Sequence, residues 1–180
     1  MNTGSGVDLI PATVRLVAAA DKLDRGYYKQ EHLIQELRGC DGYDLILVDC
    51  PPTLGVLTAN AVFASNLLLV PFPLDTFAYS GLEDLIALTG SVRRDPVAMS
   101  LLVSQFDART KRLNAAILDQ LGDQRQMLLE TRVPRCEAVR QAQGAQMPVL
   151  QYDTKATASE AFRSLATEIL SREVDHHVAA

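Results

Sequence analysis

The chain has 180 residues, of which 48% are hydrophobic and 22% are charged, and its formal net charge at pH 7 is −5. This length is enough for one substantial core, and the acidic balance argues against a protein that coats nucleic acid through its overall charge. No apolar run reaches the roughly 18 residues of a membrane span, and the first residues lack the pattern of a secretory signal. We therefore expect a cytoplasmic protein that does not bind a membrane.

The three cysteines, Cys40, Cys50 and Cys136, are an odd number. They form no C-x-x-C pair and have no histidine nearby at the spacing of metal ligands. This usage is typical of reduced thiols and argues against a disulfide framework or a zinc site.

The first half of the chain alternates between strand and helix patterns. Residues 7–12 predict a short strand closed by proline, and residues 14–20 and 33–37 predict two helices. Residues 43–48 predict a strand buried on both faces of a parallel sheet, because four consecutive apolar residues precede Asp49 and two prolines. Asp49 is then expected at the carboxyl end of a strand, where ligands bind in open α/β sheets. The alternative is that Asp49 only caps a turn.

The second half continues the alternation. Strands are expected over residues 67–73, 97–106 and 127–133, and helices over residues 57–64, 82–89, 113–121 and 158–170. Strand and helix in turn predict an α/β fold with a mostly parallel sheet flanked by helices. We expect a single domain over residues 1–172 and a polar tail over residues 173–180.

Several short sequence motifs resemble those of a known family. Residues 49–55 read DCPPTLG and residues 58–61 read TANA; FDART follows at 106–110, VPR at 133–135 and PVLQYD at 148–153. In this order they resemble the ParA family of chromosome and plasmid partition ATPases, relatives of MinD, over residues 7–170. The resemblance implies a P-loop NTPase-like fold, a homodimer, a ParB-like centromere-binding partner, nonspecific DNA binding and a location on the nucleoid.

The resemblance also assigns site residues. It implies ATP and Mg²⁺ as cofactors, with Asp49 as the Walker B aspartate and metal ligand, and a nucleotide site that comprises Asp49, Pro51, Asp107, Pro134 and Arg135. It places DNA binding on basic residues in and after the FDART and VPR motifs, namely Arg109, Lys111, Arg112, Arg135 and Arg140. One departure is that Ala138 stands where the family has an arginine, and Arg140 lies within one turn of that position.

The 180 residues contain no G-x-x-x-x-G-K-[ST] phosphate-binding loop. The family places that loop, and a second segment with a water-positioning acid, ahead of the strand expected at residue 7. A truncated gene, a fragment of a split ATPase and a wrongly assigned start codon all fit this pattern. ATP hydrolysis by this chain is expected to be negligible, since the loop supplies most of the positioning and charge for phosphoryl transfer. The family's first strand, which lies in the middle of its sheet, is also ahead of residue 7. Without that strand the chain is expected to close the gap with its own strands, to pair with another chain or to expose apolar edges.

Two functions therefore remain open. The first is a ParA-like partition protein with an incomplete nucleotide site. The alternative is a small-molecule enzyme on a doubly wound α/β sheet, whose site would lie at the edge that bears Asp49 and Asp107. The sequence shows no nucleophile and base pair and no dinucleotide-binding glycine loop that would favour this alternative.

Overall fold

The computed structural model of the chain describes residues 6–26, 29–75 and 78–178. It divides into two compact units, the first formed by Met1–Asn66 with Leu85–Val97 and the second by Leu67–Asp84 with Ala98–Ala180. Within the described residues, no helix is long and apolar enough to cross a membrane.

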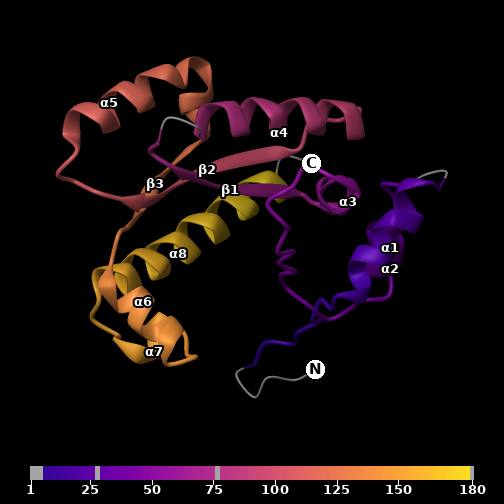
Figure 1. Cartoon of the computed structure of the whole chain (residues 1–180), viewed down its shortest axis with the longest axis horizontal. Helices are drawn as coiled ribbons and strands as arrows, with labels where there is room; N and C mark the ends of the chain where they lie inside the picture. Colours follow the sequence, from indigo (N-terminus) through magenta and orange to yellow (C-terminus); the bar gives the residue numbers. More distant parts are fainter. Residues whose placement is uncertain (1–5, 27–28, 76–77, 179–180) are drawn as a thin grey trace. The chain divides into compact units, whose positions relative to one another are not determined.

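The second unit contains a parallel sheet of three strands in the order β1-β2-β3 (Figure 1). The strands are β1 (Leu67–Pro73), β2 (Ala98–Phe106) and β3 (Leu128–Pro134). β1 pairs with β2 from Leu67 opposite Ala98 to Pro73 opposite Ser104. The three strands predicted in this region and their parallel direction are confirmed.

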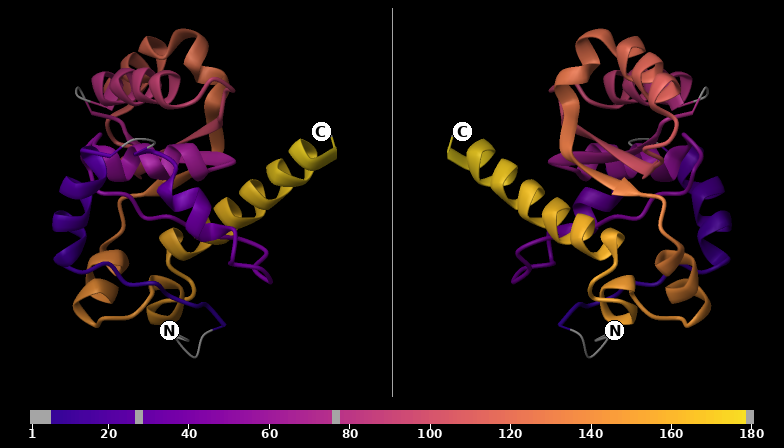
Figure 2. Two further views of the ribbon diagram at one scale, coloured as in Figure 1. Left: turned by 90° about the vertical axis from the view of Figure 1, so that its right-hand side faces the viewer. Right: turned by 90° about the vertical axis from the view of Figure 1, so that its left-hand side faces the viewer.

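Helices cover both faces of this sheet. The helices on its faces are α5 (Lys111–Gln120) and α8 (Thr157–Val178) (Figure 1). The remaining helical elements after β1 are α4 (Ala78–Val92), the 3-10 helix η1 (Gly122–Met127), α6 (Glu137–Gly144) and α7 (Val149–Tyr152). α5 and α8 lie on opposite sides of the strands (Figures 1 and 2). A parallel sheet needs this arrangement because its apolar strands must be covered on both faces.

Side chains from β2, β3 and α8 form the core on one face of the sheet. This cluster contains Leu102, Leu129, Val133 and Leu165, and Ala161, Phe162 and Ile169 of α8 pack against it. The apolar stripe predicted for the last helix is therefore core packing, as expected. Successive strand residues point to opposite faces, so Leu101 and Val103 are buried on the face that α5 covers.

The outer edge of β3 is closed by a side chain of α8. The Glu168 carboxylate accepts hydrogen bonds from the backbone N–H groups of Glu130 (2.8 Å) and Thr131 (2.9 Å), and Arg172 pairs with it at 3.3 Å. Burial by itself would raise the pKa of Glu168. The backbone and side-chain donors and the Arg172 charge outweigh burial, so the pKa of this carboxyl lies below its ordinary value.

The first unit is organised around a buried asparagine. Its helices are α1 (Arg15–Asp24), α2 (His32–Leu37) and α3 (Val56–Ala64), which confirm the three helices predicted there. The Asn60 side chain donates to Lys29 O (2.6 Å) and Val56 O (2.8 Å) and accepts from Leu33 N (3.1 Å). This asparagine of the TANA motif therefore joins α3 to α2 and to the residues that precede α2.

The two strands predicted at residues 7–12 and 43–48 are not formed. Residues 45–48 carry no strand, and Leu45, Ile46, Leu47 and Val48 are 44%, 44%, 83% and 41% exposed. Residues 7–12 hold only one bridging residue, Asp8, whose carboxylate accepts a hydrogen bond from Tyr43 Oη at 2.8 Å. The prediction for residues 43–48 was wrong because an apolar segment becomes a strand only when neighbouring strands satisfy its backbone, and this segment forms no ladder with the described residues. Residues 7–12 form a single bridge in place of the predicted strand. Of the three outcomes left open for this part of the sheet, the described residues of segment 45–48 show exposed apolar side chains.

Candidate functional site

The candidate site in the second unit lies at the carboxyl ends of β2 and β3. Asp107 follows β2, and Pro134 and Arg135 end and follow β3. The backbone N–H of Arg135 donates to Phe106 O at 3.0 Å, which ties the two strand ends together. Asp107, Arg109 and Arg135 are thereby brought to one edge of the sheet.

An ion pair fixes the loop after β2. Arg109 donates from its Nη2 to Asp107 Oδ2 (2.6 Å) and from its Nε to Oδ1 (2.9 Å), and its backbone N–H also binds Oδ1 (2.9 Å). These hydrogen bonds outweigh burial and, with the charges of Arg109 and Arg135, hold the pKa of Asp107 well below its usual range. Asp107 therefore stays ionised, and part of the Arg109 charge is neutralised.

The next turn of the chain presents two more basic residues. Buried Asn114 holds this loop through its amide, which donates to Asp107 O at 2.9 Å. Lys111 and Arg112 occupy the first turn of α5 and are exposed. Cations at a helix N-terminus oppose the helix dipole, so these two charges do not stabilise α5 and are available to an anion.

Two further arginines belong to β3 and α6. Arg132 of β3 lies over the Phe106 ring, 5.2 Å from its centroid, and was not predicted for this surface. The sequence alone could not place Arg132 beside Phe106, because the pairing register of β2 and β3 was not known. Arg140 of α6 pairs with Glu137 at 3.5 Å, with both side chains exposed, so its charge is partly offset.

The remaining predicted site residues, Asp49 and Pro51, belong to the first unit and are exposed. Burial, followed by the charge of Asp49, raises the pKa of the neighbouring Cys50 thiol. Among the described residues, no group of three or more His, Cys, Asp or Glu side chains could hold a metal ion. Asp49 is one carboxylate on a segment without strand structure, so these residues do not by themselves fit Mg–ATP.

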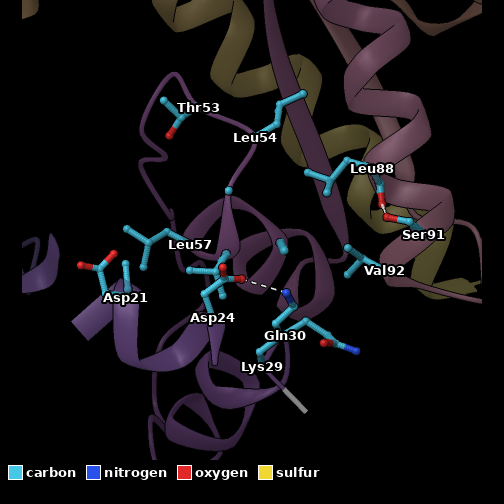
Figure 3. Close-up of a pocket in the computed structure, with 14 residues that line it drawn as sticks. Asp21, Asp24, Lys29, Gln30, Thr53, Leu54, Leu57, Leu88, Ser91 and Val92 are labelled. Atoms are coloured by element: carbon cyan, nitrogen blue, oxygen red, sulfur yellow. Dashed lines mark hydrogen bonds and ion pairs between the residues drawn. The ribbon is translucent and has the colours of Figure 1, made fainter. Parts of the chain in front are cut away.

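A cavity of about 620 Å³ lies within the first unit (Figure 3). Asp21 and Asp24 at the end of α1, Lys29, and Leu88 and Ser91 of α4 contribute to its wall. Lys29 Nζ and Asp24 Oδ1 form an ion pair at 2.8 Å on one side. Its size is that of a small-molecule pocket, yet none of the predicted site residues lines it. Thr53, Leu54 and Gly55 of the DCPPTLG motif also line it, but the sequence did not indicate a cavity there, since the rest of its wall comes from distant segments.

Comparison with known proteins gives a consistent set of relatives. A family profile described as "AAA domain" matches residues 1–101. The chromosome partitioning protein ParA of Caulobacter vibrioides (strain NA1000 / CB15N) is 30% identical over 182 residues, which cover 97% of this chain and 68% of that protein. The chromosome-partitioning ATPase Soj of Treponema pallidum (strain Nichols) is 32% identical over 177 residues, which cover 94% of this chain and 66% of that protein.

Among solved structures, the chain is similar to cobyrinic acid a,c-diamide synthase from Mycobacterium smegmatis. The TM-score is 0.71 at 25% identity, and the match covers 89% of this chain and 60% of the synthase. Another structure of that synthase contains ADP and magnesium. The chain thus spans about two thirds of the length of the partition proteins and 60% of the synthase.

Proposed function

Because the chain belongs to the ParA family of partition proteins, we propose that it acts in the segregation of chromosomal or plasmid DNA and binds DNA nonspecifically through the second unit. The observation that carries this proposal is the hydrogen bond between Arg135 N and Phe106 O, since it unites the loops after β2 and β3. We call the basic residues of this edge the strand-end cluster; it comprises Arg109, Lys111, Arg112, Arg132 and Arg135.

The charge balance of the strand-end cluster supports contact with phosphates. Asp107 offsets one positive charge by pairing with Arg109, and four of the five basic residues have no ion pair in the part of the chain that the structure describes. Phosphate contacts need only charge and reach. Arg140 is a further candidate from α6, at the cost of its pairing with Glu137.

The net charge of −5 limits the strength of this binding. Long-range repulsion of DNA by the acidic remainder weakens association at low salt. We therefore expect weak and strongly salt-dependent binding, with a slope of the log of affinity against the log of salt of about 0.9 per phosphate contacted.

The nucleotide site is a separate part of the proposal. The resemblance assigns Asp49 to the metal end and the region of Pro134 to the base end of an ATP site that also includes Pro51, Asp107 and Arg135. Because the described residues do not by themselves fit Mg–ATP, ATP binding by the 180-residue chain should be weak or absent. A ParB-like partner, a homodimer and a cytoplasmic, nucleoid-associated location are proposed from the family alone.

The experiment that tests this proposal compares DNA binding by the wild-type chain with DNA binding by the Arg109→Ala, Arg135→Ala double variant. Fluorescence anisotropy with a labelled random-sequence duplex is measured from low to physiological salt. Both affinity and salt slope should fall, the slope by up to about 0.9 for each phosphate that the variant no longer neutralises. The matched control is the Arg38→Ala, Arg94→Ala double variant, which removes two exposed charges of the first unit. Equal binding by both double variants, or tight binding by the wild-type chain at physiological salt, contradicts the proposal.

The alternative, a small-molecule enzyme, is favoured by the cavity of the first unit (Figure 3). Its walls supply carboxylates, an amide and hydroxyls, and the Ser91 hydroxyl donates to Leu88 O at 2.7 Å. No nucleophile and base pair occurs among the described residues that line it. This alternative therefore ranks below DNA partition. It predicts a small molecule that raises the melting temperature of the chain and loses this effect when Ser91 is replaced by Leu.

A further inference from the structure

An acidic residue lies among the basic residues of the strand-end cluster. Asp107 pairs with Arg109 through two parallel hydrogen bonds, from Nη2 to Oδ2 at 2.6 Å and from Nε to Oδ1 at 2.9 Å. Phosphate groups bind arginine through the same planar arrangement of donors. Asp107 therefore occupies the edge of the Arg109 guanidinium group that a DNA phosphate would use.

The two members of this pair are held to different degrees. The Asp107 side chain is 22% exposed, whereas the Arg109 side chain is 85% exposed. The Asp107 carboxylate also accepts a hydrogen bond from the Arg109 backbone N–H at 2.9 Å, and the Asp107 carbonyl accepts one from Asn114 Nδ2 at 2.9 Å. These bonds hold Asp107 in place without the Arg109 side chain, so the guanidinium group is the part that is free to turn toward another anion.

Arg135 lowers the cost of separating the pair. The hydrogen bonds from Arg109 are the main reason that the pKa of the Asp107 carboxyl lies below its usual range, and the positive charge of Arg135 acts in the same direction. The carboxylate therefore still faces a cation and a backbone donor when the Arg109 side chain turns away. Exposed ion pairs contribute little in water, so a phosphate can compete with Asp107 for Arg109.

We propose that Asp107 limits the strength of DNA binding by the strand-end cluster, because a phosphate must displace it from Arg109. This inference rests on the proposed function and names a contact that regulates it. In the unbound chain, Arg109 contributes less than one full positive charge to the surface. Exchange of the carboxylate for a phosphate releases fewer salt ions than binding by an unpaired arginine, because the freed carboxylate attracts a cation in turn.

The test compares Asp107→Asn with Asp119→Asn in the full 180-residue chain. Asp107→Asn removes the negative charge and keeps an oxygen acceptor for the Arg109 backbone N–H. The matched control is Asp119→Asn, because Asp119 pairs with Arg125 at 3.3 Å in the same unit and its replacement changes the net charge equally. Fluorescence anisotropy with a labelled random-sequence duplex gives the affinity from low to physiological salt, and circular dichroism checks that each variant is folded.

Asp107→Asn should bind DNA more tightly than the wild-type chain, with a salt slope that is steeper by up to about 0.9. If the two salt curves meet at about 1 M, this slope corresponds to a gain of about fivefold at roughly 0.15 M salt and about fifteenfold at roughly 0.05 M. Asp119→Asn should change the affinity by less than about twofold at physiological salt, where distant charges are screened. In an Arg109→Ala background, Asp107→Asn should lose most of its gain, because the arginine that it frees is absent.

A second measurement needs only the wild-type chain. The nitrogen-15 NMR signal of the Arg109 Nε–H group reports its hydrogen bond to Asp107. Addition of the duplex should shift this signal and leave the Arg125 Nε–H signal in place, because phosphate replaces the carboxylate only at Arg109.

Three results would overturn the proposal. The first is an equal gain in affinity from Asp107→Asn and Asp119→Asn, and the second is a gain from Asp107→Asn that persists in full in the Arg109→Ala background. The third is an Arg109 Nε–H signal that stays unchanged at saturating duplex, and this result decides the question even if Asp107→Asn fails to fold. A complete lack of DNA binding by the wild-type chain and by both variants would instead refute the proposed function, and this inference with it.

Discussion

Replacing Glu168 tests how the edge of β3 is stabilised. Its carboxylate accepts two backbone hydrogen bonds, at 2.8 and 2.9 Å, and its side chain is only 16% exposed. Hydrogen bonds to a charged group contribute about 1.5–3 kcal/mol each when buried. At a sheet edge, water can hydrogen-bond to the freed amides and restore part of this free energy. Glu168→Ala should therefore lower the free energy of unfolding by about 2–3 kcal/mol, and Glu168→Gln by about 1 kcal/mol, since an amide oxygen still accepts.

The pH dependence follows from the direction of the pKa shift. The pKa of Glu168 is lower in the folded chain than its ordinary value. The stabilisation by its charge is therefore complete above the unfolded pKa of about 4.3 and is lost as the pH falls through the folded pKa. The difference in unfolding free energy between wild type and Glu168→Gln should shrink in acid.

Urea denaturation at pH 7 and in acid gives these free energies, and hydrogen exchange of the Glu130 and Thr131 amides gives a local measurement. Both amides should exchange faster in Glu168→Ala. The control is Glu130→Gln, which changes an exposed carboxylate on the same strand and should alter stability by less than about 0.5 kcal/mol. If Glu168→Ala leaves the stability within that limit and both exchange rates unchanged, the carboxylate does not protect the edge.

Three further predictions concern other parts of the chain. Calorimetry with Mg²⁺ and ATP should show no micromolar binding, and light scattering should show no ATP-dependent dimer; either observation would reveal a phosphate-binding arrangement that differs from the P-loop. Leu165→Ala should lower the free energy of unfolding in urea by about 2–5 kcal/mol, because Leu165 lies in the core, whereas Leu170→Ala, at a residue 54% exposed, should cost far less. In Cys136, donors from Ala158, Thr157, Ala138 and Val139 outweigh burial and lower the thiol pKa, so mass spectrometry should show alkylation of Cys136 at a lower pH than Cys50; the reverse order would contradict these contacts.

The elements predicted correctly from sequence are those with a local signal. Prolines mark the end of β1, and β2 and β3 lie between turn residues, so each strand could be recognised on its own. Helical periodicity served equally well for α8, whose apolar stripe packs on the sheet. These signals depend on a few neighbouring residues and do not require knowledge of the partner.

Segment 44–49 shows where this reasoning fails. Its apolar run is a correct description of a strand with neighbours on both sides, but pairing is a property of two segments and not of one. The Glu168 contact was missed for a related reason. Glu168 lies 38 residues from Glu130 along the chain, and an acid on a helix carries no sign that it binds a strand edge.

Part of the candidate site was also beyond sequence reasoning. From the FDART motif we predicted Asp107 and Arg109 as separate site residues, whereas the structure shows them as an ion pair, with Arg109 Nη2 2.6 Å from Asp107 Oδ2. An arginine two residues after an aspartate can point toward it or away, and the backbone conformation of the loop decides which. The buried contacts of Asn60 are another example, since they join segments 27 and 31 residues apart.

The contact between Glu168 and β3 also sets an order of events during synthesis. β3 ends at Pro134, and Glu168 leaves the ribosome 34 residues later, which corresponds to about 2–7 s at typical elongation rates. During that interval the Glu130 and Thr131 amides have no carboxylate to bind, and the nascent sheet can pair with another strand. Variants or conditions that slow translation between residues 135 and 168 should therefore increase aggregation of newly made chains without changing the stability of the finished protein.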